Sequence, residues 1–233
     1  MPLLKNPINF FASKKSILAL QVLNENLWFP PVSEALGDGL LAIGGDLKPE
    51  RLILAYKNGI FPWYDGDLPL WWNPNPRFVL FPEELVVSKS MKTTINQQKF
   101  VFTINQAFEE VIDNCKKIER KNQDGTWINE DVKTAYIQLH KMGYAHSAET
   151  WLNNQLVGGL YGIKMGKIFF GESMFAKESN ASKFALIHYV QQLQTEGIAL
   201  IDCQVYTEHL ESLGAKMIMR EQFMQLIEHL IES

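Results

Sequence analysis

The chain lacks the features that mark several classes of protein. Its 233 residues include only two cysteines, Cys115 and Cys203, which form no CxxC pair; this argues against a disulfide framework and predicts two reduced thiols. No segment approaches the roughly 20 consecutive apolar residues that a membrane span needs. Lysines interrupt residues 1–20, where a signal peptide would be continuously apolar. We therefore expect a cytoplasmic protein with no membrane partner.

Several motifs of catalysis and binding are also absent. The sequence contains no GxxxxGK[ST] phosphate loop, no GxGxxG turn that opens a helix, no HExxH zinc motif and no GxSxG nucleophile elbow. The net charge of −4 differs from the strong basic excess of proteins that coat nucleic acid. We expect chemistry by positioning and electrostatics, with no metal and no cofactor.

Two regions of different composition follow one another along the chain. Residues 27–77 are rich in Pro, Gly and Trp, which interrupt regular elements, and one helix is predicted there, at about 49–58. From about Phe78 the patterns become regular. They predict helices at 105–118 (capped by Asn105), 129–142, 180–195 and 221–231, and strands at 145–152, 156–163, 168–172 and 198–203.

This order of elements predicts an α/β (α+β) fold with a mixed central sheet. We expect residues 1–78 to form a small irregular N-terminal domain and residues 79–233 to form the main domain. On spacing and composition alone, the sequence indicates an α/β enzyme, with acyltransferase as one candidate class, and nothing narrower.

Four motifs then occur in order over most of the chain. The first joins LLAIGGDL (40–47) to GIFPWY (59–64), the second is LWWNPNPR (70–77), and the third is GTWI (125–128). The fourth comprises VGGLYG (157–162), FGESMF (170–175), NASK (180–183) and LIDCQ (200–204). As an ordered set, from about Phe29 to Gly214, they resemble the leucyl/phenylalanyl-tRNA–protein transferase family. The resemblance implies that the main domain is an acetyltransferase-like (GNAT-type) acyltransferase domain.

The resemblance also implies an activity. Members of that family transfer leucine or phenylalanine from Leu-tRNA or Phe-tRNA to proteins that begin with Lys or Arg, which marks those proteins for degradation. The chain is therefore expected to be an aminoacyltransferase. We also expect a monomer, although the sequence itself leaves the oligomeric state open. Its expected partners are aminoacyl-tRNA and such acceptor proteins, with methionine as a third candidate donor.

Four side chains are expected to hold the 3′ end of the aminoacyl-tRNA. By the resemblance, Trp63 and Trp127 would stack on the terminal adenosine, because a base offers its face to an aromatic ring; core packing is the alternative for each. Tyr136 is a weaker candidate for the same site. Glu172 ends a strand that is predicted to be buried, where a carboxylate needs a partner, and the α-ammonium group of the carried amino acid would supply it.

Asp202 and Gln204 are the expected catalytic pair. They lie two apart on a strand, so their side chains share a face. By the resemblance, Asp202 would hold the Gln204 amide so that its oxygen meets the attacking amine. The donor side chain would enter an apolar pocket, although plain core packing fits each candidate residue almost as well. The candidates are Leu160, Phe169, Leu186 and Ile201.

Three other functions compete with this interpretation. An acyl-CoA N-acyltransferase would have the same fold, but it would carry a glycine-rich turn before a helix, which this sequence lacks. A tRNA-dependent enzyme of cell-wall cross-bridges would need a longer chain with a doubled domain. An RNA-binding adaptor without activity fits the acidic charge and the polar residues at the predicted site less well.

Overall fold

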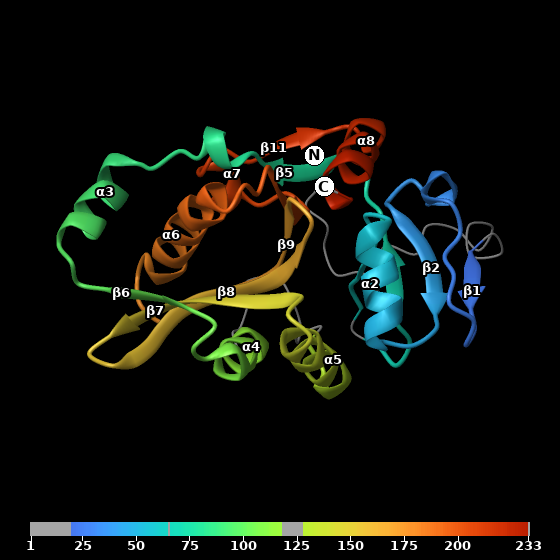
Figure 1. The fold of residues 1–233 in the computed structure, drawn as a ribbon, viewed down its shortest axis with the longest axis horizontal. Helices are drawn as coiled ribbons and strands as arrows, with labels where there is room; N and C mark the ends of the chain where they lie inside the picture. The colour runs from blue at the N-terminus through green and yellow to red at the C-terminus, as the bar shows by residue number, and fades with distance from the viewer. Residues whose placement is uncertain (1–19, 65, 118–127, 233) are drawn as a thin grey trace.

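The computed structural model describes residues 20–64, 66–117 and 128–232. Its strands form two sheets, which lie side by side in Figure 1. The smaller sheet has the order β1 (Gln21–Leu23), β2 (Leu40–Gly44), β4 (Leu70–Trp72), β3 (Phe61–Pro62). The larger sheet has the order β11 (Lys216–Ile218), β5 (Arg77–Leu80), β10 (Leu200–Gln204), β9 (Ile168–Ala176), β8 (Gln155–Met165), β7 (Ala145–Leu152), β6 (Val101–Ile104).

Helices cover both faces of the larger sheet. Figure 1 shows α4 (Phe108–Lys117) and α5 (Glu130–Lys141) on one face and α6 (Ala181–Thr195) on the other. The sheet is mixed, because β10 runs parallel to β9 whereas the other pairs are antiparallel. The remaining helices are α2 (Pro49–Lys57), α3 (Lys89–Asn96), α7 (Glu208–Glu211) and α8 (Arg220–Ile231), with short 3-10 turns at Val32–Glu34 and Pro82–Glu84.

The structure confirms the α/β class, the mixed main sheet and most of the predicted elements. In α5, Asn129 caps the helix by accepting the Val132 N–H at 2.9 Å, as expected from its position. The Asn105 cap is wrong: α4 begins at Phe108, and Asn105 Oδ1 instead accepts the Ser147 N–H of β7. Asn105 has a left-handed φ of 58°, which an asparagine tolerates better than most residues do.

The N-terminal region is more regular than its composition predicts. Residues 27–77, expected to be irregular apart from one helix, contribute three strands of the smaller sheet. These strands have only two to five residues each. A strand this short shows almost no alternation of apolar and polar residues, so its pattern cannot be recognised in the sequence.

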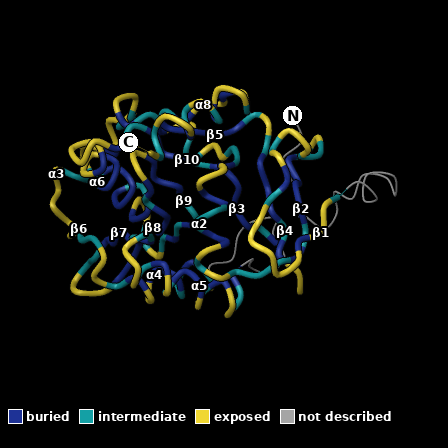
Figure 2. Tube along the Cα trace, turned by 45° about the vertical axis from the view of Figure 1, so that its right-hand side comes forward, coloured by how far each residue is buried: buried dark blue, intermediate teal, exposed yellow. Residues whose placement is uncertain are grey.

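One hydrophobic core joins the two sheets. The first cluster of buried residues includes Leu41 and Trp71 of the smaller sheet together with Val132 of α5 and Phe223 of α8. Figure 2 shows the buried segments continuing from one sheet to the other. The division at residue 78 stays a prediction; it cuts β5, all of which pairs within the larger sheet.

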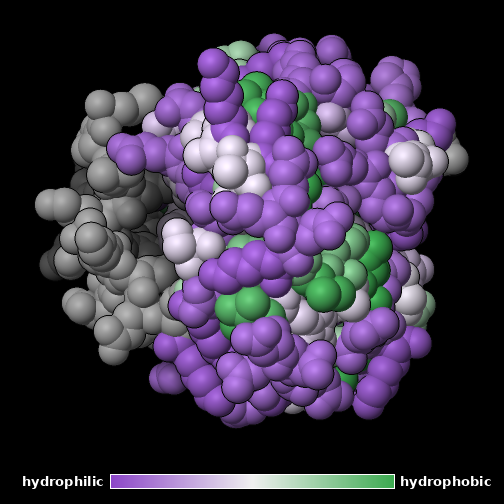
Figure 3. All heavy atoms as spheres, turned by 90° about the vertical axis from the view of Figure 1, so that its left-hand side faces the viewer, coloured by the Kyte–Doolittle hydropathy of each residue, from purple (hydrophilic) through white to green (hydrophobic). Residues whose placement is uncertain are grey.

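The surface at the end of the molecule that carries α3 and β6 is mostly hydrophilic. Figure 3 shows hydrophobic side chains gathered in several places among the hydrophilic ones. Val86 and Val101, from this part of the chain, are 52% and 61% exposed. Among the residues that the structure describes, no helix is long and apolar enough to cross a membrane.

Candidate active site

The candidate site contains Glu172 of β9 and Asp202 and Gln204 of β10. These residues lie where the parallel pairing of β9 with β10 ends. The pairing of β10 with β9 reaches its last partners at Asp202 and Phe170. Just beyond this point, both strands shift register against their antiparallel neighbours: β8 pairs with Gly171 and Ser173 but skips Glu172, and β5 skips Cys203. Such bulges change the direction of side chains. They place Glu172 and Gln204 next to each other.

Glu172 accepts hydrogen bonds from three neutral side chains. Oε1 accepts the Tyr56 hydroxyl at 2.8 Å and Gln204 Nε2 at 3.0 Å, while Oε2 accepts the Tyr136 hydroxyl at 2.9 Å. The two tyrosine hydroxyls also contact each other. Within the described part of the chain, Glu172 forms no ion pair with Lys, Arg or His. The residue as a whole is half-buried.

This environment changes the protonation of the site. Burial, aided by the negative charge of Asp202, raises the pKa of Glu172 to about 7, although the hydrogen bonds from Tyr56, Tyr136 and Gln204 oppose the rise. Burial, followed by the nearby Glu172 charge, holds the pKa of both tyrosines well above the usual value. The tyrosines are therefore neutral donors near pH 7. The Glu172 carboxylate has only neutral hydrogen-bond donors around it among the described residues, so it would bind a cation favourably.

The donors come from distant parts of the chain. Tyr56 is on α2 beside the smaller sheet, Tyr136 is on α5, and Gln204 ends β10. All three side chains are buried. The site is thus built where α2 packs against α5 and the Tyr56 side chain reaches β9, so a residue from the N-terminal region completes it.

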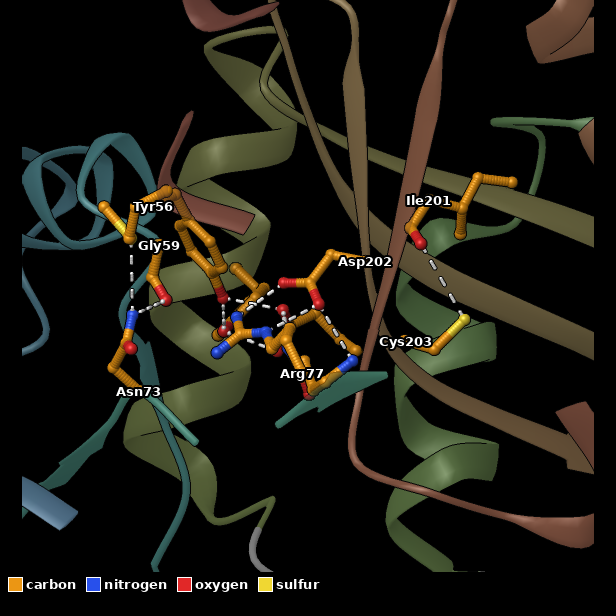
Figure 4. A network of polar contacts seen from close by, with 11 residues as sticks. Tyr56, Gly59, Asn73, Arg77, Ile201, Asp202 and Cys203 are labelled. Carbon is orange, nitrogen blue, oxygen red and sulfur yellow. Dashed lines mark hydrogen bonds and ion pairs between the residues drawn. The ribbon is translucent and has the colours of Figure 1, made fainter. Parts of the chain in front are cut away.

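Asp202 does not hold the Gln204 side chain, which corrects the expected arrangement. Figure 4 shows its carboxylate facing Arg77, and the two oxygens accept Arg77 Nε at 2.8 Å and Nη2 at 2.6 Å. Oδ1 also accepts the backbone N–H of Gln204 at 2.9 Å. The side-chain amide of Gln204 turns to Glu172 instead. The bulge at Cys203 explains the difference, because Asp202 and Gln204 no longer follow simple strand alternation.

The candidates for nucleotide stacking are only partly described. Trp63 follows β3 and is partly exposed; its ring centroid lies 5.9 Å from that of Trp72. The Trp63 carbonyl accepts Trp72 Nε1 at 2.6 Å, which fixes the backbone here. Trp127 lies outside the described residues. Stacking on adenosine stays a prediction for both.

The four pocket candidates lie together. Each is at most 4% exposed, and all belong to the second cluster of buried residues, between the larger sheet and α6. A shared cluster fits both core packing and a pocket wall. A pocket for the donor side chain therefore stays a prediction for these residues, which are Leu160, Phe169, Leu186 and Ile201.

Two residues of the candidate site, Tyr56 and Arg77, were not predicted from the sequence. Tyr56 belongs to the helix predicted at 49–58, whose apolar positions gave no reason to single out one hydroxyl. Arg77 ends the LWWNPNPR motif and enters the apolar run Phe78–Leu80. A charged residue at the start of a buried strand was the available signal, because a buried charge needs a partner.

Comparison with known proteins identifies the family. The family model described as leucyl/phenylalanyl-tRNA protein transferase matches residues 79–228, and the model of its N-terminal domain matches residues 45–75. The chain belongs to this family. Among the described residues of this family member, no group of three or more His, Cys, Asp or Glu side chains is arranged to hold a metal ion.

Close relatives are leucyl/phenylalanyl-tRNA–protein transferases over nearly their whole length. The chain is 56% identical to that of Flavobacterium johnsoniae over 206 residues, which cover 88% of this chain and 97% of the relative. It is 55% identical to that of Christiangramia forsetii over 208 residues, covering 88% and 98%.

Likeness to solved structures is more distant. A GCN5-related N-acetyltransferase from Kribbella flavida aligns with a TM-score of 0.37 and 9% identity, over 70% of this chain and 58% of that one. The structure of L-PGS from Bacillus licheniformis aligns with a TM-score of 0.40 and 13% identity, over 82% and 73%.

Proposed function

We propose that this chain transfers leucine, phenylalanine or methionine from aminoacyl-tRNA to the α-amino group of proteins that begin with Lys or Arg. In the cytoplasm this transfer would mark the acceptor for N-degron degradation. Membership of the family supports the transfer of an aminoacyl group from tRNA to protein. The observation that carries the proposal is the Glu172 carboxylate, which three neutral donors hold and no described cation neutralises.

Glu172 is proposed to bind the α-ammonium group of the carried amino acid. A carboxylate in low-dielectric surroundings interacts strongly with a cation that replaces its lost hydration. Tyr56, Tyr136 and Gln204 fix the carboxylate so that it does not rearrange when the substrate arrives. An acyl group without the ammonium, such as acetyl, would leave this carboxylate without a partner, which favours an aminoacyl donor over acetyl-CoA.

Gln204 is proposed to orient the attacking amine. Its Nε2 faces Glu172, so its Oε1 is the end of the amide that can accept a hydrogen from the incoming α-amino group. An α-amino group has a pKa of about 7.7–8.0, so a useful fraction is neutral near pH 7. A neutral amide is a very weak base, and Gln204 therefore acts by orientation and by passing a hydrogen bond.

The reaction then needs no redox or covalent enzyme intermediate. The amine nitrogen attacks the carbonyl carbon of the ester, the new C–N bond forms, and the C–O bond to the tRNA ribose breaks. The proton that the amine loses ends on the ribose oxygen, directly or through a water molecule. The proposed stacking of Trp63 and Trp127 on the terminal adenosine would hold the ester in place, with the donor side chain among Leu160, Phe169, Leu186 and Ile201.

The turn that leads into α6 supports this donor over acyl-CoA. The residues between β9 and α6 are Lys177, Glu178, Ser179 and Asn180, none of which is glycine. A glycine at such a turn lets the backbone approach a pyrophosphate closely. The α6 N-terminus packs tightly instead: a Cβ at Gly158 of β8 would lie 2.6 Å from the Ala181 Cβ.

The test is transfer of radiolabelled leucine. The purified protein is incubated with [¹⁴C]Leu-tRNA and a protein that begins with Arg; the remaining tRNA ester is hydrolysed and acid-precipitable label is counted. We expect label that depends on the enzyme and disappears when the acceptor N-terminus is acetylated. A matched acceptor that begins with Glu should remain unlabelled. Label from acetyl-CoA but none from Leu-tRNA would overturn the proposal.

A further inference from the structure

A buried ion pair next to the site has no place in the chemistry above. Arg77 and Asp202 are both fully buried, and two parallel hydrogen bonds join them. Removing two charges from water costs free energy, and apolar residues of similar volume often stabilise a fold as well or better. Stability alone therefore explains this pair poorly, which leads us to ask what it positions.

Arg77 is fixed from three elements. Its own strand, β5, pairs with β10 on one side and β11 on the other. Its guanidinium carbon lies 4.7 Å from the ring centroid of Phe61 on β3 and 4.5 Å from that of Phe223 on α8. Arg77 Nε and Nη2 both point at Asp202. The planar guanidinium thus has a single orientation, and it transfers that orientation to the carboxylate.

Asp202 passes this constraint to Gln204. Its Oδ1, which accepts Arg77 Nε, also accepts the backbone N–H of Gln204 at 2.9 Å. Gln204 has a left-handed φ of 63°, which is uncommon for a residue other than glycine and needs support from its surroundings. With this backbone conformation, Gln204 Nε2 reaches Glu172 Oε1 at 3.0 Å.

We infer that Arg77 is a positioning residue for aminoacyl transfer, acting through Asp202 to hold the Gln204 backbone and so direct the Gln204 side chain to Glu172. Asp202 is then a link in this chain of contacts, and its carboxylate faces Arg77 and the Gln204 backbone. The inference rests on the roles proposed above for Gln204 and Glu172. A shift of about 1 Å in such a group can lower a rate by about 100-fold.

The first experiment uses Arg77→Lys, which keeps a positive charge but cannot form two parallel hydrogen bonds. The rate of a single turnover is measured at saturating Leu-tRNA with the acceptor that begins with Arg. We expect a rate about 10- to 100-fold below that of the wild type and a dissociation constant for Leu-tRNA within about twofold of it. A wild-type rate for R77K would overturn the inference, because charge alone would then suffice.

The second experiment tests whether Arg77 acts through Asp202. The rates of Asp202→Asn and of the double variant R77M/D202N are compared; the double variant removes both buried charges and so avoids an unpaired one. We expect the two rates to agree within about threefold, because Arg77 has nothing to position once the carboxylate is gone. A double variant that is much slower than D202N would show an independent role and overturn the inference.

A packing control separates rate from stability. Ile227→Val trims a buried residue of α8 and leaves both the ion pair and the two rings beside the guanidinium in place. We expect it to lower the melting temperature and to keep the single-turnover rate; a rate as low as that of R77K would make the effect one of packing and overturn the inference. The wild-type rate, measured first, tests the proposed function by itself, and the Arg77 result is read only from ratios to it.

Discussion

The raised pKa of Glu172 predicts an unusual dependence of stability on pH, which the substitution Glu172→Gln should remove. Burial raises this pKa from 4.5 to about 7. The native chain therefore binds a proton that the unfolded chain releases at pH 4.5. The free energy of unfolding should fall as the pH rises from about 4.5 to 7 and then level off, because ionisation is more costly in the folded state.

The size of the pKa shift of Glu172 also determines how much the free energy of unfolding changes with pH. At about 1.4 kcal/mol per pH unit, a rise from 4.5 to about 7 corresponds to about 3 kcal/mol. This figure is an upper bound, since Glu172 is partly exposed and water reduces the cost of its charge. The E172Q chain has no proton to release here. Its stability relative to the wild type should therefore increase with pH over this window.

Urea unfolding at half-unit steps from pH 5 to pH 8 measures this difference. Glu178→Gln is the matched control, because Glu178 is 44% exposed and pairs with Lys99 at the surface. The E178Q curve should run parallel to the wild type, whereas E172Q should diverge from it. Parallel curves for E172Q and wild type would refute the reasoning, since Glu172 would then titrate alike in the folded and unfolded chains. In the transfer assay, E172Q should also weaken use of Leu-tRNA, whose α-ammonium group loses its partner.

Two further predictions test the shape of the site. Gly162→Ala should destabilise the fold by about 2 kcal/mol or more and slow transfer, because the new Cβ would overlap the carbonyl oxygen of Phe170 beside the Glu172 bulge. Gly171, the cross-strand partner of Gly162, supplies the control. In Gly171→Ala the new Cβ would meet only the Asp202 carbonyl oxygen at 3.6 Å, so this variant should be tolerated in the same thermal melts. Trp63→Ala should raise the KM for Leu-tRNA by about 5- to 150-fold, from the loss of about 1–3 kcal/mol of stacking, with less effect on the KM for the acceptor. Trp63→Phe should recover most of the loss, and equal effects on both substrates would remove the stacking role.

The elements that sequence patterns predicted well are those long enough to show a period. The strand predicted at 145–152 matches β7 residue for residue, and the helix predicted at 180–195 matches α6 within one residue. The Asn129 cap was predictable because a cap depends on neighbours three residues away. The strands of the smaller sheet were missed for the opposite reason, since each is too short to reveal its alternation.

The site depends on contacts that no local pattern contains. Tyr56 and Glu172 are 116 residues apart, and Arg77 and Asp202 are 125 apart. Arg77 meets Asp202 because β5 pairs with β10, whereas Tyr56 meets Glu172 because Tyr56 of α2 reaches β9, where its ring also contacts Phe170. The sequence reveals neither neighbour directly. The two register shifts add a further step: they decide which side chain faces which, and simple alternation gave the wrong partner for Asp202.

The same geometry explains why one site can require two parts of the chain. The larger sheet alone supplies Glu172, Asp202 and Gln204, but its carboxylates would repel each other without added donors. The N-terminal region supplies the Tyr56 hydroxyl for one carboxylate and the ring of Phe61 beside the arginine that pairs with the other. Arg77 neutralises the Asp202 carboxylate inside the protein, whereas no described cation neutralises the Glu172 carboxylate. This division supports the proposal that Glu172 receives the α-ammonium group.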